Sequence, residues 1–144
     1  MVNGAVYVGS EDGNVYALSA ATGAQLWSHP TGNSVYSSPA VASGAVYVGS
    51  EDGNVYALSA ATGAQLWSHP TGGGISSPAV ANGVVYVGSD NGSVYALKAS
   101  TGAQLWSHPT GGASSPAVAN GVVYVGANDS IYALNAATGA QLWS

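Results

Sequence analysis

The acidic residues and the histidines are the groups in this sequence whose types and spacing could do chemistry. The acidic residues all fall in one recurring short segment: Glu11, Asp12, Glu51, Asp52, Asp90 and Asp129. The histidines each stand in a recurring Trp-Ser-His-Pro segment: His29, His69 and His108. Carboxylates and imidazoles gathered on one surface attract cations or a basic partner. We therefore treat the four aspartates and the three histidines as a candidate binding rim.

Turn formation offers a second explanation for the same residues. Asp-Gly and Asn-Gly are the pairs that a two-residue type I′ hairpin requires, so the aspartates can serve the turn alone. The histidines recur singly, without a His-x-His or His-x-x-x-His pair, and this spacing predicts no metal site. We expect each histidine to form local hydrogen bonds in a turn beside Pro30, Pro70 or Pro109.

The elements that must position these residues recur four times. A tyrosine in the segment Val-Tyr-Val-Gly returns at intervals of 40, 39 and 38 residues: Tyr7, Tyr47, Tyr86 and Tyr124. Residues 4–32 and 44–72 are identical. Periods of this length indicate a repeat architecture. The sequence therefore predicts a single array over residues 1–144, with repeats at about 1–36, 37–75, 76–113 and 114–144.

Each repeat contains four short segments of β character, which read SSPAVA, VVYVG, VYAL and QLWS or close variants. Asn-Gly, Asp-Gly and Thr-Gly pairs separate them, and no segment has the spacing of an amphipathic helix. Since VVYVG and VYAL are apolar almost throughout, both faces of the sheet must be covered. Four-stranded antiparallel blades packed around an axis satisfy this requirement, so the sequence predicts an all-β fold, a β-propeller. A solenoid is the alternative.

The repeat SSPAVANGVVYVGSDNGSVYALKASTGAQLWS resembles that of the pyrroloquinoline-quinone-type propellers, and the resemblance extends over the whole chain. Propellers of that family usually have seven or eight blades. An acidic residue usually follows Tyr-Ala-Leu in the family, and here that place holds Ser19, Ser59, Lys98 and Asn135. Quinoprotein dehydrogenases of this type hold calcium with carboxylates and an amide, and use a catalytic aspartate. Every acid here belongs to a repeated turn, so we expect no enzyme, no cofactor and no metal.

The repeats begin at a second strand and end at a fourth. The first blade is therefore expected to lack its innermost strand, with residues 1–4 at most a stub of it. Four repeats correspond to half of an eight-bladed ring, and an open end would expose an apolar blade face. We predict that two chains close one ring as a homodimer. A closed four-bladed monomer and a chain cut from a longer protein are the alternatives.

Two further sets of residues recur with the strands. A tryptophan on each outermost strand is expected to fill the widening wedge between neighbouring blades: Trp27, Trp67, Trp106 and Trp143. A serine begins each innermost strand and is assigned to a candidate channel mouth: Ser38, Ser77 and Ser115. No histidine–carboxylate pair or nucleophile elbow accompanies these serines, so we predict no nucleophilic catalysis.

The composition excludes several classes of partner. Lys98 is the sole residue of the Lys and Arg class and the net charge is −5, which excludes phosphate-backbone binding and so nucleic acid. No apolar run approaches the ~20 residues of a membrane helix, so no membrane insertion is expected. The low charged fraction of 5% and the many Ser, Thr, Gly and Tyr residues favour an extracytoplasmic location.

The sequence thus favours a non-enzymatic scaffold that binds a protein or ligand through its rim and central channel. A multivalent carbohydrate-binding propeller, with one shallow site per blade, is the second hypothesis. A fragment of a quinoprotein dehydrogenase is the third. Recent amplification or engineering of the repeats, with no evolved ligand, also accounts for their near identity.

Overall fold

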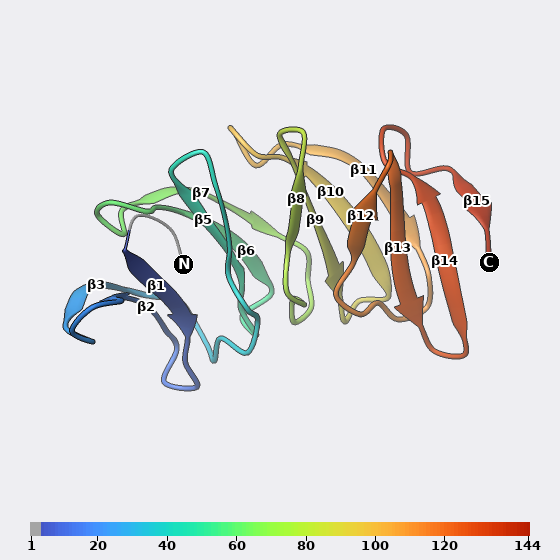
Figure 1. Cartoon of the computed structure of the whole chain (residues 1–144). Helices are drawn as coiled ribbons and strands as arrows, with labels where there is room; N and C mark the ends of the chain where they lie inside the picture. The colour runs from blue at the N-terminus through green and yellow to red at the C-terminus, as the bar shows by residue number, and fades with distance from the viewer. Residues whose placement is uncertain (1–3) are drawn as a thin grey trace.

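The computed structural model describes residues 4–144 as four β-sheets set side by side along an arc, with the first and last sheets at its two ends (Figure 1). The first sheet contains β1 (Ala5–Gly9), β2 (Asn14–Ser19) and β3 (Gln25–Pro30). The second contains β4 (Ala40–Ala42), β5 (Ala45–Gly49), β6 (Asn54–Ser59) and β7 (Gln65–Pro70). The third contains β8 (Ala79–Ala81), β9 (Val84–Ser89), β10 (Ser93–Lys98) and β11 (Gln104–Pro109). The fourth contains β12 (Ala117–Ala119), β13 (Val122–Ala127), β14 (Ser130–Asn135) and β15 (Gln141–Trp143).

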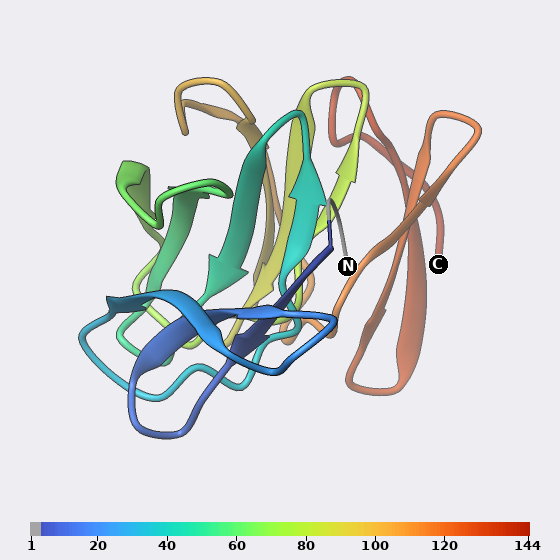
Figure 2. The same ribbon diagram turned by 60° about the vertical axis from the view of Figure 1, so that its left-hand side comes forward.

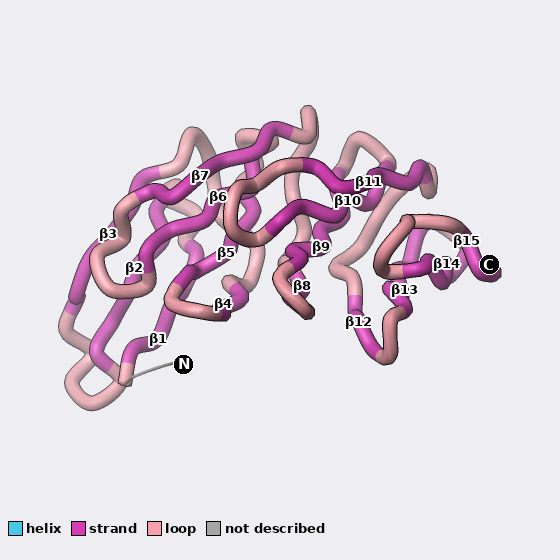
Figure 3. The backbone as a smooth tube through the Cα atoms, turned by 90° about the horizontal axis from the view of Figure 1, so that it is seen from above, coloured by secondary structure: helices cyan, strands magenta, loops and turns pink. Residues whose placement is uncertain are grey.

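Every sheet is an antiparallel meander, which confirms the all-β propeller architecture. Seen from above, β4, β8 and β12 follow the inner side of the arc, while β3, β7 and β11 follow the outer side (Figure 3). Over residues 4–144 the first sheet has three strands and each of the others has four, as the repeat frame predicts. The stub expected at residues 1–4 lies mostly outside the described residues. No helix over residues 4–144 is long and apolar enough to cross a membrane.

The inner strands are shorter than the sequence indicates. In the second sheet the strand begins at Ala40, because Pro39 has no amide hydrogen to donate to the ladder. The Ser37 hydroxyl replaces the missing ladder bonds, since it donates to the Gly49 carbonyl at 2.9 Å and accepts the Gly49 amide at 2.8 Å. The outer strands are longer than expected and run through the His-Pro pair.

Two kinds of turn join the strands. The hairpins between first and second strands have positive φ at both central residues, as at Asn82 (50°) and Gly83 (75°), which is the type I′ pattern. The acidic hairpins differ, and the type I′ assignment is wrong for Asp12-Gly13. Only Gly13 has a positive φ there (87°), and its amide donates to the Ser10 carbonyl at 3.1 Å. The positive φ of this turn therefore requires glycine at Gly13 only, and the turn conformation alone does not require aspartate at Asp12.

The core lies between the sheets. Three apolar clusters occupy the three contacts between neighbouring sheets, which we call joints. At the first joint, Val15 and Trp27 of one sheet pack with Val46, Val48 and Leu58 of the next. The two middle sheets are thus covered on both faces, which explains why their central strands are apolar almost throughout.

A pair of aromatic donors closes each joint. Tyr7 Oη and Trp27 Nε1 both donate to the carbonyl oxygen of Ala60 in the next sheet, at 3.2 and 3.0 Å. The same arrangement recurs at the next two joints, where the accepting carbonyls belong to Ala99 and Ala136. We call this unit the Tyr–Trp clamp. It satisfies both polar tips of two large aromatic side chains inside an apolar joint.

The inner edge of β1 has no neighbouring strand among the described residues, and Figure 2 turns this end of the arc toward the viewer. A synthetic peptide with the sequence of residues 76–83, which contains β8, is expected to bind there by strand addition. In the third sheet β8 pairs antiparallel with β9, and β1 is the equivalent of β9 in the first sheet. Titration of a labelled peptide, followed by fluorescence anisotropy, measures the binding. A scrambled peptide is the control, and equal binding of the two peptides would contradict strand addition.

Candidate functional site

The acidic hairpins and the connectors that follow the outer strands lie on one face, the lower edge of Figure 1, which we call the lower face. The Thr31 amide donates to the Gly13 carbonyl at 2.7 Å, which joins connector and hairpin within the first sheet. The Gly32 amide donates to Asp52 Oδ2 at 2.8 Å, which joins the same connector to the second sheet. The strand directions therefore bring carboxylates and connectors together, as the sequence predicts.

Asp52 is held by hydrogen bonds of the fold. Its carboxylate accepts from Tyr56 Oη at 2.6 Å and from the Asn54 amide at 2.8 Å, in addition to the Gly32 amide. Asp12 accepts the equivalent bonds from Tyr16 and Asn14, at 2.6 and 2.9 Å. These hydrogen bonds, led by that from Tyr16, lower the pKa of Asp12 to about 2. Asp12 therefore positions its turn, and Asp52 positions both its turn and the joint with the first sheet.

The other two aspartates of the candidate rim occupy different positions. In the third sheet Asn91 takes the place of Asp52, since its side chain bonds the Ser93 amide, Tyr95 Oη and the Thr71 carbonyl. Asp90 is thus the equivalent of Glu51 and stands one residue earlier. Asp129 follows Asn128 in a hairpin that is one residue shorter, and Asn128 donates to the Gly111 carbonyl at 3.0 Å. The four aspartates therefore do not form one repeated set.

The Asp52–Tyr56 pair makes stability depend on pH at both extremes. Burial alone raises the pKa of Asp52, but hydrogen bonds from Tyr56, Gly32 and Asn54 outweigh it, so the pKa lies below its usual value. Its contribution is therefore present above about pH 4 and is lost as the pH falls through the folded-state value. Burial, with the Asp52 carboxylate, raises the pKa of Tyr56 to about 12. That contribution is complete below about pH 10 and is lost between about pH 10 and 12.

Asp52→Asn is expected to reduce the pH dependence of unfolding at both limits, measured by urea denaturation from pH 2 to 12. Asn91 demonstrates that an amide can make the corresponding hydrogen bonds in this fold. Glu51→Gln is the control, because the Glu51 side chain takes no part in these bonds. An acid limb of the Asp52→Asn profile that coincides with the parent's would contradict the assignment.

The histidines lie in strands and reach across the joints. The His29 ring lies 6.1 Å from the Tyr56 ring, centroid to centroid, and is tilted by 58° against it; His69 and His108 make the same tilted contact with Tyr95 and Tyr132. The expectation of turn hydrogen bonds beside proline is therefore wrong: the outer strand continues through His-Pro, and the ring faces the next sheet. Over residues 4–144 no three His, Cys, Asp or Glu side chains cluster at metal-binding distance.

The predicted channel-mouth serines link neighbouring sheets. The Ser38 amide donates to Ser77 Oγ at 2.7 Å, and the Ser77 amide donates to Ser115 Oγ at 3.1 Å. Each accepting hydroxyl retains a hydrogen of its own, so Ser77 and Ser115 can still donate to a bound group. The serines therefore both order the mouth and offer donors there.

A pocket of about 240 Å³ joins this mouth to two of the acidic hairpins. Its lining includes Tyr36, Glu51, Asp90, Ser77 and Ser115. The two carboxylates flank Gly74: Glu51 Oε2 and Asp90 Oδ2 lie 2.7 and 2.8 Å from the point where a Cβ would stand. We call this site the channel-mouth pocket. The predicted binding rim included neither Tyr36 nor Glu51, although Tyr36 is an insertion that the other connectors lack.

The sequence of this chain matches a known protein family. A family model described as outer membrane protein assembly factor BamB matches residues 1–78 and 51–144. The chain belongs to this family. The family resemblance drawn from the repeat is thereby confirmed. No curated protein matches the chain.

Solved structures place the BamB-family chain among the propellers. BamB from Moraxella catarrhalis superposes with a TM-score of 0.85 at 23% identity, over 96% of this chain and 48% of that one. The computationally designed Ika8 protein gives 0.88 at 23% identity, over 99% and 46%. Quinohemoprotein alcohol dehydrogenase ADHIIG from Pseudomonas putida HK5 gives 0.89 at 25% identity, over 99% and 32%. The chain thus spans less than half the length of each of these proteins, and it shares their fold.

Proposed function

We propose that this BamB-family chain is a non-enzymatic scaffold whose lower face holds a basic segment of a partner protein. The observation that carries the proposal is the channel-mouth pocket. Two carboxylates converge on the Cβ position of Gly74, and the Tyr36 side chain, largely exposed, lines the same pocket. A Lys or Arg side chain would find charge, an aromatic face and hydroxyl groups within one site. The net charge of −5 adds long-range attraction for such a partner.

Two further features support the non-enzymatic character and the location that we propose. Asp12 and Asp52 are engaged in turn hydrogen bonds, and among the described residues no histidine lines the channel-mouth pocket, so no histidine–carboxylate pair stands beside the serines. The family description as an outer membrane assembly factor supports an extracytoplasmic location.

A Lys-rich peptide, acetyl-Gly-Lys-Gly-Lys-Gly-Lys-amide, tests the proposal by isothermal titration calorimetry. We expect saturable binding that weakens with added salt. Glu51→Gln combined with Asp90→Asn should weaken binding at least tenfold, since it removes both charges of the pocket. Glu11→Gln is the matched control, because Glu11 occupies the equivalent hairpin position in the first sheet, outside the pocket. Equal loss in the control would contradict a defined site.

A carbohydrate-binding role is the second candidate, favoured by the opposite face. Equivalent grooves of about 790 and 450 Å³ lie at successive joints, the first lined by Tyr47 and Leu66 and the second by Tyr86 and Leu105. Repeated shallow sites suit multivalent binding of glycans. A glycan array decides between the candidates: binding that free monosaccharide competes away favours the second. Turnover of an alcohol with added quinone, calcium and a dye acceptor would instead favour the dehydrogenase hypothesis.

A further inference from the structure

Each joint inside the arc consists of two faces, one with the Tyr–Trp clamp and one with the accepting carbonyl. The last sheet exposes a face of the first kind, and the first sheet exposes a face of the second kind. We propose that these end faces bind each other across two copies of this chain, head to tail, through the Tyr–Trp clamp of one copy and the Ala20 carbonyl of the other. Two copies of four sheets then close one ring. The proposal is independent of what the lower face binds.

The last sheet presents the donor half. Trp143 is 52% exposed, whereas its equivalent Trp106 is 9% exposed. Ile131 is 60% exposed, whereas the equivalent Val94 is fully buried. Tyr124 and Trp143 still stack on each other with centroids 6.1 Å apart, as the pairs at the inner joints do. The clamp is therefore formed in advance, and what it lacks among the described residues is an accepting carbonyl.

The first sheet presents the acceptor half. Val8 is 37% exposed, whereas the equivalent Val48 is fully buried. At Gly63, Gly102 and Gly139, the point where a Cβ would stand lies 2.6 Å from a tryptophan ring of the preceding sheet. At Gly23, the equivalent position in the first sheet, no atom of the described residues beyond its chain neighbours lies within 4 Å. The Ala20 carbonyl and Gly23 thus form a seat for an indole ring that no described residue occupies.

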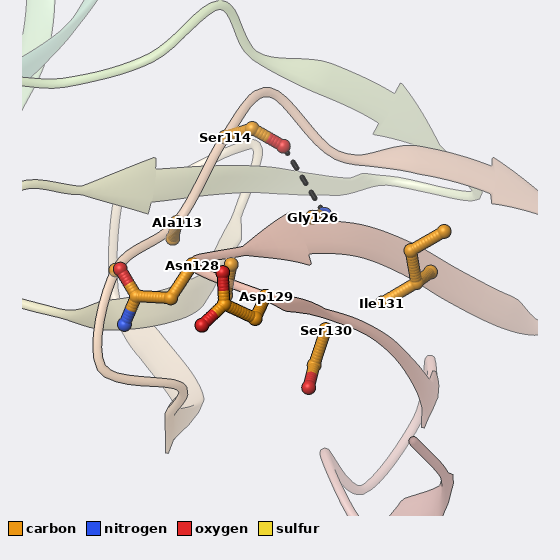
Figure 4. A pocket seen from close by; sticks show the side chains of 9 residues that line it. Ala113, Ser114, Gly126, Asn128, Asp129, Ser130 and Ile131 are labelled. Atoms are coloured by element: carbon orange, nitrogen blue, oxygen red, sulfur yellow. Dashed lines mark hydrogen bonds between the residues drawn. The ribbon is translucent and has the colours of Figure 1, made fainter.

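The two end faces lack the connector side chain that is present at each inner joint. At the inner joints a connector side chain covers the glycine that ends the second strand, as Val35 covers Gly9 and Ile75 covers Gly49. At Gly126, Ser114 alone among the described residues beyond the chain neighbours lies within 4 Å, and a hollow of about 610 Å³ remains beside Asn128, Asp129 and Ile131 (Figure 4). The joint between copies therefore lacks one connector, and we expect it to open more readily than the inner joints.

The end faces differ from each other, so the contact between copies is heterologous. Such contacts give a closed ring when the rotation closes and an open chain when it does not. The arc superposes on just under half of BamB from Moraxella catarrhalis and of the Ika8 protein, which is the curvature that two equal arcs need to complete a ring. We therefore expect association to stop at two copies.

Sedimentation velocity of the full chain over a range of concentrations tests the proposal. We expect the mass to rise from 14.1 kDa to twice that value and to stop there. Gly23→Ala should remain at 14.1 kDa, because its Cβ occupies the seat for the indole. Gly44→Ala is the matched control: its φ is 78° against 73° at Gly23, and nothing lies within 4 Å of it. Circular dichroism checks that both variants fold.

Mixing two variants tests the direction of the contact. Gly23→Ala retains an intact donor end, and Trp143→Ala retains an intact acceptor end, so each alone should stay monomeric. Their mixture should form a 1:1 complex through the single intact joint. A parent chain that remains monomeric at every concentration, Gly23→Ala that associates as the parent does, or a mixture that forms no complex would each overturn the proposal. A mass that continues to rise beyond two copies would overturn ring closure.

Discussion

Trp106→Ala is expected to lower the free energy of unfolding by about 3–5 kcal/mol, the range for removal of a buried aromatic side chain. Trp106 is 9% exposed, packs against Gly139 and donates to the Ala136 carbonyl at 2.9 Å. The substitution removes the indole from the joint between the third and fourth sheets and leaves that carbonyl with Tyr86 alone. Equilibrium urea denaturation, followed by circular dichroism, measures the difference.

Trp143→Ala is the matched control for this change. Trp143 has the same preceding residues, Gln-Leu, and stacks on Tyr124 as Trp106 stacks on Tyr86. It donates to no carbonyl among the described residues, so its loss in dilute solution should cost about 1 kcal/mol. Equal costs at the two positions would show that the strand environment, and not the joint, determines the contribution of the indole.

Gly63→Ala is expected to destabilise the fold by about 2–5 kcal/mol, as the sum of two effects. Gly63 has a φ of 76°, and an L-residue in that conformation costs about 1–2 kcal/mol. Its new methyl group would also lie 2.6 Å from a carbon of the Trp27 ring, and overpacking of this kind costs about 1–3 kcal/mol. Thermal unfolding of the variant measures the total.

Gly23→Ala separates the two effects, because Gly23 lies in an identical sequence segment with a φ of 73°, and no described residue beyond its chain neighbours comes within 4 Å of its Cβ position. In dilute solution it should show the backbone cost of about 1–2 kcal/mol alone. A difference between the two variants close to zero would mean that the Trp27 ring moves aside without cost, and the close packing assigned to the joint would be wrong.

The repeats made the architecture readable from the sequence. The recurring strand segments, three copies of the first kind and four of each other kind, predicted the meander, and the frame of the copies predicted the three-stranded first sheet. Two-sided burial followed from segments such as Val84–Ser89, which are apolar almost throughout. These features depend on local pattern, and that is why sequence reasoning reached them.

The joints were less accessible to sequence reasoning, because their partners lie far apart in the chain. Trp27 and the Ala60 carbonyl are 33 residues apart, and a backbone carbonyl carries no side-chain signature. The prediction that every outer-strand tryptophan fills a wedge is right for Trp27 and Trp106, and wrong for Trp143, which ends the arc. Alternation of Trp27 and His29 along one strand face was the signal that could have placed the histidines across the joint.

The candidate site was predicted in part. The strand directions placed the acidic hairpins and the connectors on one face, as observed. The sequence could not indicate that Glu51 and Asp90 converge on Gly74, because the convergence depends on the curvature between two sheets. Nor could it separate Asp52, which is bonded within the fold, from Asp90, which lines the channel-mouth pocket.

Every joint in this chain is formed by the same two kinds of face, so the contacts at a joint do not select one particular sheet as the partner. Residues 4–32 and 44–72 are identical, and a folding chain can therefore dock a sheet against the wrong repeat, of the same or another molecule, with nearly native contacts. Such errors must be undone before folding can finish. Refolding yield should consequently fall as protein concentration rises. Sequence differences between repeats would disfavour docking of the sheets in the wrong order.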